Sequence, residues 1–406
     1  MTVHDVIVVG GGPAGISAAT ALAQSGAGNI VLLDRESEIG GIPRHTEHLG
    51  FGVRDMHRLL SGPRYAAELR TRAERAGVEI RPSTTAIDWV GPTSLRVVDS
   101  GGIFQLAART VVLATGVRER PRAARLVAGD RPSGVFTTGS LQQLAAFHRL
   151  AAGRRAVIVG AEHVSFSAVL TLRHLGCDVA AMVTPFARQQ TSAPLRWATA
   201  SRHRVPIIVN DDVVEIHGRE RVQAVTLRSG RRIPCDTVVF TGDWIPEHEL
   251  SRRGSLTLDP SHLGAAVDQA LRTSRPGVFA AGNLVHPAET ADRCAVGGQS
   301  VVSGVCDWLS NPVWPTRSLA IRVDPPLRWI TPHHLHLGKG QLPGRLILRV
   351  DCITDAGRAR VCQGDRELWA GRIRGRAIPN RSISIPGRSV AGADPDGEPI
   401  VVRLQT

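Results

Sequence analysis

Short apolar runs that end at glycine recur along the first part of the chain. Val6–Val9 is followed by Gly10, and Ala156–Val159 is followed by Gly160. Such runs, bounded by turn residues, are typical of strands that are buried on both faces of a sheet. The stretches rich in small residues that follow each glycine predict helices. These positions therefore indicate a parallel sheet flanked by helices.

The apolar pattern repeats after 150 residues. Val6–Gly15 aligns without a gap with Ala156–Ser165, and the later run Thr110–Gly116 has its counterpart at Thr237–Gly242. Each copy shows a strand, a glycine turn, a helix and a second strand, which is the beginning of a βαβ unit. The whole module is duplicated, so the sequence predicts two Rossmann-like dinucleotide-binding domains.

Further elements connect and follow the two copies. A helix is expected around Pro63–Ala76, and short strands are expected from Val78 to Val98. A strand within Pro276–Asn283 precedes a helical stretch from about Gly298 to Leu309. These elements complete the first module.

The tail from about Arg317 to Thr406 alternates with the period of β-strands. Turn signals such as Gly364-Asp365 separate its runs, which predicts a small antiparallel sandwich or barrel. The tail carries no assignable motif, so a lid, an oligomerisation surface and a partner-docking module all stay open.

The first glycine turn carries a nucleotide-binding fingerprint. Gly10-x-Gly12-x-x-Gly15 follows a predicted strand and begins a helix. Gly10 permits the tight turn, Gly12 lets the backbone approach a pyrophosphate, and Gly15 lets helix and strand pack closely. Asp34 ends the second strand, where an acid can bond ribose hydroxyls. The motif, its context and the acid together predict a bound dinucleotide.

The order of these features resembles the two-dinucleotide-domain flavoprotein superfamily that includes glutathione and thioredoxin reductases, over about residues 1–312. The resemblance implies that the first domain binds FAD and that Gly282 and Asn283 meet the ribityl chain and the pyrophosphate. The superfamily usually has Asp where Asn283 stands. Its disulfide reductases also need a cysteine pair beside the flavin, and this sequence has none.

The fold class implied is α/β, with two glutathione reductase-like Rossmann domains and a small C-terminal all-β domain. We expect an FAD-binding domain at residues 1–118 and 243–312, a second domain at 119–242, and the β domain at 317–406. The residues expected to contact FAD are Gly10, Gly12, Pro13, Ala14, Gly15, Asp34, Arg35, Gly41, Ile42, Thr115, Gly116, Gly282 and Asn283.

The stretch Gly41–Leu60, with Gly62-Pro63-x-Tyr65-Ala66, resembles one branch of this superfamily. That branch holds the FAD-containing subunits of opine oxidases and hydrogen cyanide synthase, and small-amine or proline dehydrogenases. The resemblance implies oxidation of a C–N bond in a small-molecule substrate, and a second flavoprotein or an iron–sulfur protein as a partner subunit. Such subunits often carry a cysteine-rich iron–sulfur segment, which this chain replaces with its β tail.

The second fingerprint has lost its key residues. Glu162 stands where a glycine should admit the cofactor pyrophosphate, and Thr184 replaces the ribose-binding acid. A carboxylate repels phosphate by about 4 kcal/mol at 4 Å and an effective dielectric of 20. Ser165 is a tolerable third position, and Arg188 keeps NADPH open through its 2′-phosphate. We therefore expect weak NAD(P)H binding, while an NAD(P)H-dependent flavoprotein reductase and a non-catalytic electron-relay subunit stay as alternatives.

Two segments offer candidates for proton transfer and substrate binding. Arg44 and His45 follow the Gly40-Gly41 loop, so His45 is a candidate base and Arg44 a candidate partner for a substrate carboxylate. His286 and Glu289 follow Gly282 and Asn283, which we call the last flavin segment, and are further candidates. For each pair, a role without catalytic function is the equal alternative. A buried structural thiol is the preferred interpretation of Cys294.

Composition excludes several other functions. The net charge is +13, but the cationic residues are almost all arginines spread along the chain, so no nucleic-acid partner is expected. The six cysteines include no CxxC pair, which argues against a redox dithiol, a zinc site or an iron–sulfur cluster. The chain has no long apolar run and no signal peptide, so we expect no membrane partner and a cytoplasmic enzyme.

Overall fold

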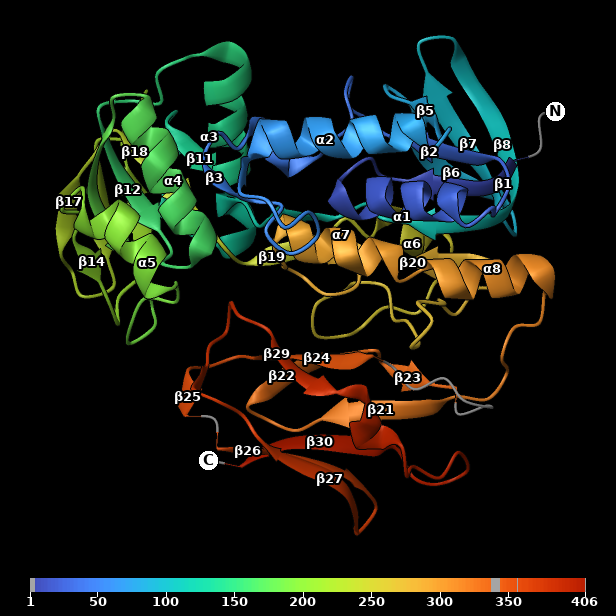
Figure 1. The fold of residues 1–406 in the computed structure, drawn as a ribbon. Coiled ribbons are helices and arrows are strands. Elements are labelled where there is room, and N and C mark those ends of the chain that lie inside the picture. Colours follow the sequence, from blue (N-terminus) through green and yellow to red (C-terminus); the bar gives the residue numbers. More distant parts are fainter. Residues whose placement is uncertain (1–3, 337–343, 356, 406) are drawn as a thin grey trace. The chain divides into compact units, whose positions relative to one another are not determined.

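The first glycine turn lies at the end of β1 (His4–Val9), in the middle of a seven-stranded sheet. The computed structural model describes residues 4–336, 344–355 and 357–405. The chain forms two units, the first from Met1–Arg44, Gly50–Val117 and Pro246–Thr406, the second from His45–Leu49 and Arg118–Ile245. Figure 1 shows the elements of both.

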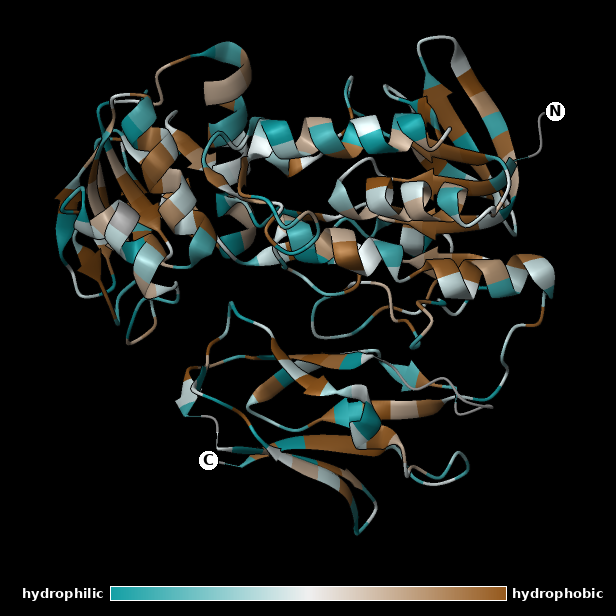
Figure 2. Ribbon diagram, viewed as in Figure 1, coloured by the Kyte–Doolittle hydropathy of each residue, from teal (hydrophilic) through white to brown (hydrophobic). Residues whose placement is uncertain are grey.

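Alternate side chains of β1 enter two different cores. Val6 and Val8 pack with Ile16 of the helix α1 (Pro13–Gln24), whereas Ile7 and Val9 pack on the opposite face. Because both faces are covered, the strand is continuously apolar, and Figure 2 shows the central strands mainly in brown. The strands of this sheet, in the order β5-β2-β1-β8-β7-β6 with β20 also on β8, are β2 (Ile30–Leu33), β5 (Glu79–Arg81), β6 (Thr85–Gly91), β7 (Ser94–Asp99), β8 (Gly102–Leu113) and β20 (Val278–Ala280).

One long strand joins the parallel and antiparallel parts of the sheet. The first half of β8 pairs antiparallel with β7, and its second half pairs parallel with β1 and β20. The sequence pattern located only the buried second half, because most side chains of the first half are exposed or half-buried. The helices of this unit are α1, α2 (Gly62–Arg75), α6 (Glu249–Arg253), α7 (Ala291–Gln299) and α8 (Val302–Ser310).

The second unit repeats the arrangement of the first. Its helix α4 (His163–His174) begins and ends 150 residues after α1, as the internal repeat predicts. Its parallel sheet has the order β11-β18-β12-β13-β14, with β11 (Val135–Thr137), β12 (Arg155–Val159), β13 (Asp178–Val183), β14 (Ile207–Ile208) and β18 (Thr237–Phe240). The unit also contains α3 (Thr138–Gln143), α5 (Ala193–Arg196), β10 (Ala128–Gly129), β15 (Val213–His217), β16 (Ala224–Leu227) and β17 (Arg232–Pro234).

Among the described residues, the tail forms two larger sheets around one core and a small two-stranded sheet of β25 (Thr354–Asp355) and β28 (Arg376–Ala377), and it belongs to the first unit. The antiparallel prediction is wrong for one pair, because β21 and β30 run parallel. These two strands are far apart in the sequence, so no hairpin fixes their direction. The two larger sheets are β23-β21-β30-β26-β27 and β22-β24-β29, with β21 (Leu319–Val323), β22 (Leu327–Thr331), β23 (His334–Leu335), β24 (Arg345–Val350), β26 (Arg358–Gln363), β27 (Arg366–Arg372), β29 (Ile383–Pro386) and β30 (Ile400–Gln405).

Candidate functional site

The first glycine turn is held by close backbone contacts and is open at one position. A Cβ at Gly10 would lie 2.4 Å from Ala114 O, and one at Gly15 would lie 1.8 Å from Gly10 O. A Cβ at Gly12 would meet nothing within 4 Å. Gly12 is also the N-cap of α1, and no side chain caps the helix there. Pro13 follows Gly12 at the start of the helix. The backbone N–H groups of this first turn are therefore available to an anion.

Three other segments converge on this turn. A Cβ at Gly41 would lie 2.9 Å from Gly12 Cα, and one at Gly282 would lie 2.5 Å from Ala14 Cβ. Gly298 of α7 is closer still, since its Cβ would lie 2.0 Å from Ala14 O. The structure thus brings together the predicted contacts from the first turn, the Gly41 loop and the last flavin segment. The side chain of Ile42, beside Gly41, is half-exposed. This open, uncapped turn fits the pyrophosphate of FAD.

Asp34 connects the second strand to the glycine turn. Its Oδ2 accepts a hydrogen bond from Gly11 N at 2.5 Å, and its Oδ1 accepts one from Glu36 N at 2.8 Å. Burial raises the pKa of Asp34, and the two amide donors oppose this rise. Each carboxylate oxygen has a second lone pair for a ribose hydroxyl. Arg35 is exposed and lies 3.7 Å from Glu36.

Thr115 and Gly116 lie at the end of β8, where a hydrogen-bonded crossover fixes them. Thr115 Oγ1 donates to Glu247 O at 2.7 Å, and Gly116 O accepts from Glu247 N at 3.0 Å. Gly116 has a φ of +80°, which favours glycine at this position. Both residues follow the strand next to β1, so they share the edge of the sheet at which the glycine turn lies.

The side chain of Asn283 closes a loop. Its Oδ1 accepts from Glu289 N at 2.7 Å, and its Nδ2 donates to Glu289 O at 3.2 Å. The family resemblance implies that this carboxamide contacts the ribityl chain. In the structure one N–H and one lone pair remain for that role. Asn283 therefore holds the segment 283–289 whether or not it also bonds the flavin.

The two candidates in that loop differ in their protonation chemistry. Burial raises the pKa of Glu289. The charges of Arg349 and Arg293 and a hydrogen bond from Ser382 lower it by a larger amount, so the net pKa is below the ordinary value. Glu289 is thus an ion-paired carboxylate and a weak base. His286 is buried, and its Nδ1 has no hydrogen-bond partner in the described part of the chain. Burial lowers the pKa of His286, so it is a neutral base at neutral pH.

The loop after Gly41 divides between the two units. Arg44 belongs to the first unit, donates to Glu38 O and lies 3.6 Å from Glu36 Oε2, so acids of its own loop already engage it. His45 belongs to the second unit and packs edge-on against Phe147, with ring centroids 5.6 Å apart. Their proposed roles toward substrate and flavin stay predictions.

The next part of that loop is tied to α7 by side chains that were not among the predicted site residues. Arg54 Nη1 lies 2.9 Å from Asp292 Oδ2, and Tyr65 Oη donates to Asp55 Oδ2 at 2.7 Å. Tyr65 is fully buried, and Asp292 is nearly so. The motif around Tyr65 therefore anchors the loop against the helix that packs on Ala14. Only the tertiary pairing reveals Arg54 and Asp292.

The second glycine turn is filled by its own side chains. Glu162 is the N-cap of α4, and its Oε2 accepts from Ser165 Oγ at 2.6 Å. Ser165 Oγ lies 2.6 Å from Thr241 Oγ1, and a Cβ at Gly242 would lie 3.3 Å from the Glu162 carboxylate. Where the first copy leaves the space beside Gly12 open, the second places an internal carboxylate at the helix start.

A second acid and an arginine lie near this carboxylate. Burial raises the pKa of Glu119 to about 7, and the charge of Glu162 adds to the rise. Glu119 Oε2 accepts from Gly139 N at 2.8 Å, and Arg125 Nη2 donates to Gly242 O at 2.6 Å. Thr184, in place of the ribose-binding acid, is buried, and Arg188 is exposed. The start of α4 is therefore crowded and acidic, whereas the start of α1 is open.

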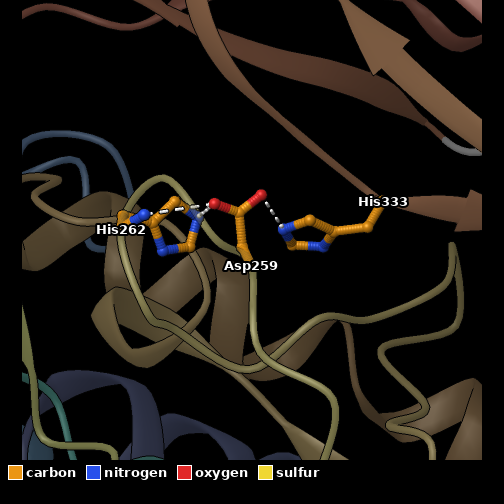
Figure 3. A group of neighbouring side chains, drawn as sticks. All are labelled: Asp259, His262 and His333. Atoms are coloured by element: carbon orange, nitrogen blue, oxygen red, sulfur yellow. Dashed lines mark hydrogen bonds and ion pairs between the residues drawn. The ribbon is translucent and has the colours of Figure 1, made fainter.

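One cluster has the composition of a metal site. Asp259 Oδ1 lies 3.6 Å from His262 Nε2, and Asp259 Oδ2 lies 3.4 Å from His333 Nε2 (Figure 3). Gly264 N donates to His262 Nδ1 at 3.0 Å, and Val267 N donates to His333 Nδ1 at 3.1 Å. Each neutral ring therefore carries its proton on Nε2, facing the carboxylate. A metal ligand needs that lone pair, so the cluster is a carboxylate clamp.

The described helices include none that is long and apolar enough to cross a membrane.

Comparisons with known proteins agree with this geometry. The family described as Pyridine nucleotide-disulphide oxidoreductase matches residues 4–299. Apoptosis-inducing factor 3 of Mus musculus is 26% identical over 297 residues, which are 69% of this chain and 45% of that protein. Sarcosine oxidase subunit alpha of Corynebacterium sp. (strain P-1) is 27% identical over 319 residues, 72% of this chain and 31% of that protein. The chain thus spans less than half the length of these two curated relatives.

A solved structure shows the same fold. The crystal structure of T. acidophilum thioredoxin reductase matches with a TM-score of 0.62 and 21% identity, over 76% of this chain and 98% of that one. This likeness confirms the predicted α/β fold with two dinucleotide-binding domains.

The clamp predicts a specific loss of stability. Asp259→Asn turns one acceptor oxygen into a donor that faces an imidazole N–H, which should lower the free energy of unfolding by about 1–3 kcal/mol. Burial raises the pKa of Asp259, but hydrogen bonding to His333 and Ser261 lowers it by more than burial raises it. Its contribution is therefore present above the ordinary value of about 3.9 and is lost as the pH falls below it. Urea unfolding at several pH values measures this contribution.

The exposed Asp365 offers the matched control, since Asp365→Asn should leave the stability unchanged. A zinc-dependent rise in Tm that Asp259→Asn abolishes would contradict the clamp and identify a metal centre.

The filled second turn predicts a gain of function. Glu162→Gly should restore an open turn at α4 and raise the affinity for NADPH or NADH at least about tenfold, by removing a like charge. Anaerobic titration with each nicotinamide, followed by flavin absorbance, measures the change. Glu162→Gln separates charge from shape because it keeps the volume. Prompt reduction of the wild-type flavin at low micromolar NADH or NADPH would contradict the hypothesis that Glu162 blocks nicotinamide binding at α4.

Proposed function

Because the chain belongs to the pyridine nucleotide-disulphide oxidoreductase family and is an FAD-dependent oxidoreductase, we propose that it oxidises the C–N bond of a small amine or amino-acid-like substrate. The observation that carries the proposal is His286, which follows the flavin segment. It is a buried neutral base whose Nδ1 has no hydrogen-bond partner among the described residues. Such a group suits a substrate that must lose a proton before it is oxidised.

The thiols of the chain do not suit disulfide chemistry. All six cysteines are free, and Cys294, the one beside the first turn, packs with Ala14 and Ala114. Burial raises the pKa of Cys294 above its usual range, so its thiol is protonated and unreactive. The sequence offers no CxxC partner for it either. This supports a substrate other than a disulfide.

The chain's own residues would act in two ways. The neutral His286 would accept a proton from the substrate ammonium, which frees the nitrogen lone pair. The substrate then loses a hydride from carbon as the C–N single bond becomes C=N, so two electrons leave with it. When bound, FAD supplies the two-electron chemistry. The paired Glu289 would keep the loop 283–289 fixed around His286 during these steps.

The filled second turn supports a protein electron acceptor. With Glu162 capping α4, NAD(P)H is a poor partner for the flavin, so electrons would leave through a second flavoprotein or an iron–sulfur subunit. The relative named sarcosine oxidase subunit alpha is by name one subunit of an oxidase, which supports both the amine substrate and the assembly. The free thiols support a cytoplasmic location.

A second candidate is an NAD(P)H-dependent flavoprotein reductase that passes electrons to a partner. The complete parallel sheet of the second unit and the exposed Arg188 favour it. A non-catalytic electron-relay subunit is a third candidate, favoured by the engagement of Arg44 and Glu289 in ion pairs.

The role of His286 predicts a separation of turnover from flavin content. His286→Ala should lower the rate of amine oxidation about 10²- to 10⁴-fold while the yellow flavin stays bound. Sarcosine and proline serve as probe substrates, with an artificial dye as acceptor. In the wild type, the acid limb of kcat/KM should lie below the ordinary His value of about 6.5, because burial favours the neutral ring.

His174, exposed at the end of α4, provides the control variant His174→Ala, which should retain full activity. Unchanged turnover in His286→Ala would remove the proposed base.

A further inference from the structure

Arg349 brings a buried charge from the C-terminal β domain to the flavin segment. It lies on β24, outside the residues that match the family, and only 6% of its side chain is exposed. Arg349 Nη2 lies 2.9 Å from Glu289 Oε1 and donates to Ala288 O at 3.1 Å. Its guanidinium carbon lies 5.3 Å from the centre of the Trp329 ring. Such a geometry fixes the guanidinium in one place.

Glu289 is in turn bonded to Asn283, a predicted contact of the flavin. Glu289 exchanges two hydrogen bonds through its backbone with the side chain of Asn283, which directly follows Gly282. Arg293 Nη1 binds the other carboxylate oxygen of Glu289 at 2.8 Å. Contacts therefore connect Arg349 of the β domain through Glu289 and Asn283 to Gly282.

The burial of this pair makes it effective. Glu289 is 5% exposed, so both charges lie out of water and interact more strongly than a surface pair. Arg349 also lies close enough to His286 to lower the pKa of that ring. A buried charge beside a bound flavin shifts the balance between the oxidised and the reduced form.

We propose that Arg349 is a positioning residue of the flavin site, which holds Glu289 and thereby Asn283 in place and sets the positive charge behind them. The β domain is on this basis part of the redox site. The proposal rests on the proposed binding of FAD at the first glycine turn, and does not depend on the identity of the substrate.

Two substitutions test it through opposite electrostatic effects. Arg349→Met and Glu289→Gln should each raise the Kd for FAD about 10- to 100-fold, because each removes a hydrogen bond to a charged group. Arg349→Met should lower the midpoint potential of the remaining bound flavin, whereas Glu289→Gln should raise it. A purely structural role would shift the potential in neither variant. Arg349→Lys keeps the charge and should restore the potential.

Controls separate this proposal from the binding of FAD itself. Arg403 forms an exposed ion pair with Asp324 in the same β domain, so Arg403→Met should match the wild type in Kd and potential. Wild-type potential and FAD affinity in Glu289→Gln would overturn the proposal, even if Arg349→Met does not fold. A wild-type protein that binds no FAD would overturn the proposed function instead.

Discussion

The close approach of backbones around Ala14 is the constraint on which the rest of the structure depends. Gly298 of α7 and Gly282 both press against Ala14, and Gly15 touches Gly10 across the turn. Side chains at these glycines would separate α1 from α7 and from the end of β1. Because these glycines have no side chains, the start of α1 lies open beside the last flavin segment. The N-terminus of α1 and this segment therefore form one site.

The two copies of the module show two ways to satisfy a helix N-terminus. Its free N–H groups and partial positive charge favour an anion. At α1 no side chain supplies one, which leaves the place to a phosphate. At α4 the chain supplies its own carboxylate from Glu162, held by Ser165. The backbone is retained, and the occupant of the turn decides what each copy can bind.

The C-terminal β domain is joined to the first module by buried polar groups. Asp259 of the first module contacts His262 of the same module and His333 of the β domain. Arg349 of the β domain pairs with Glu289, which follows the flavin segment. Both contacts link residues of the β domain to residues of the first module, so they form only when the two are packed together. The same contacts connect the domain to the site chemistry.

The sequence by itself determined the elements that depend on local pattern. The apolar runs, the glycine spacing and the 150-residue repeat predicted β1, α1, β12 and α4, and the alternation of the tail predicted β26. The tertiary structure alone decided the contacts between residues far apart in the sequence. The pairing of β21 with β30 and the ion pair of Arg349 with Glu289 are among them. Strand and helix periods are set by neighbouring residues, whereas a buried partner is chosen by how distant segments pack, and no local pattern records that choice.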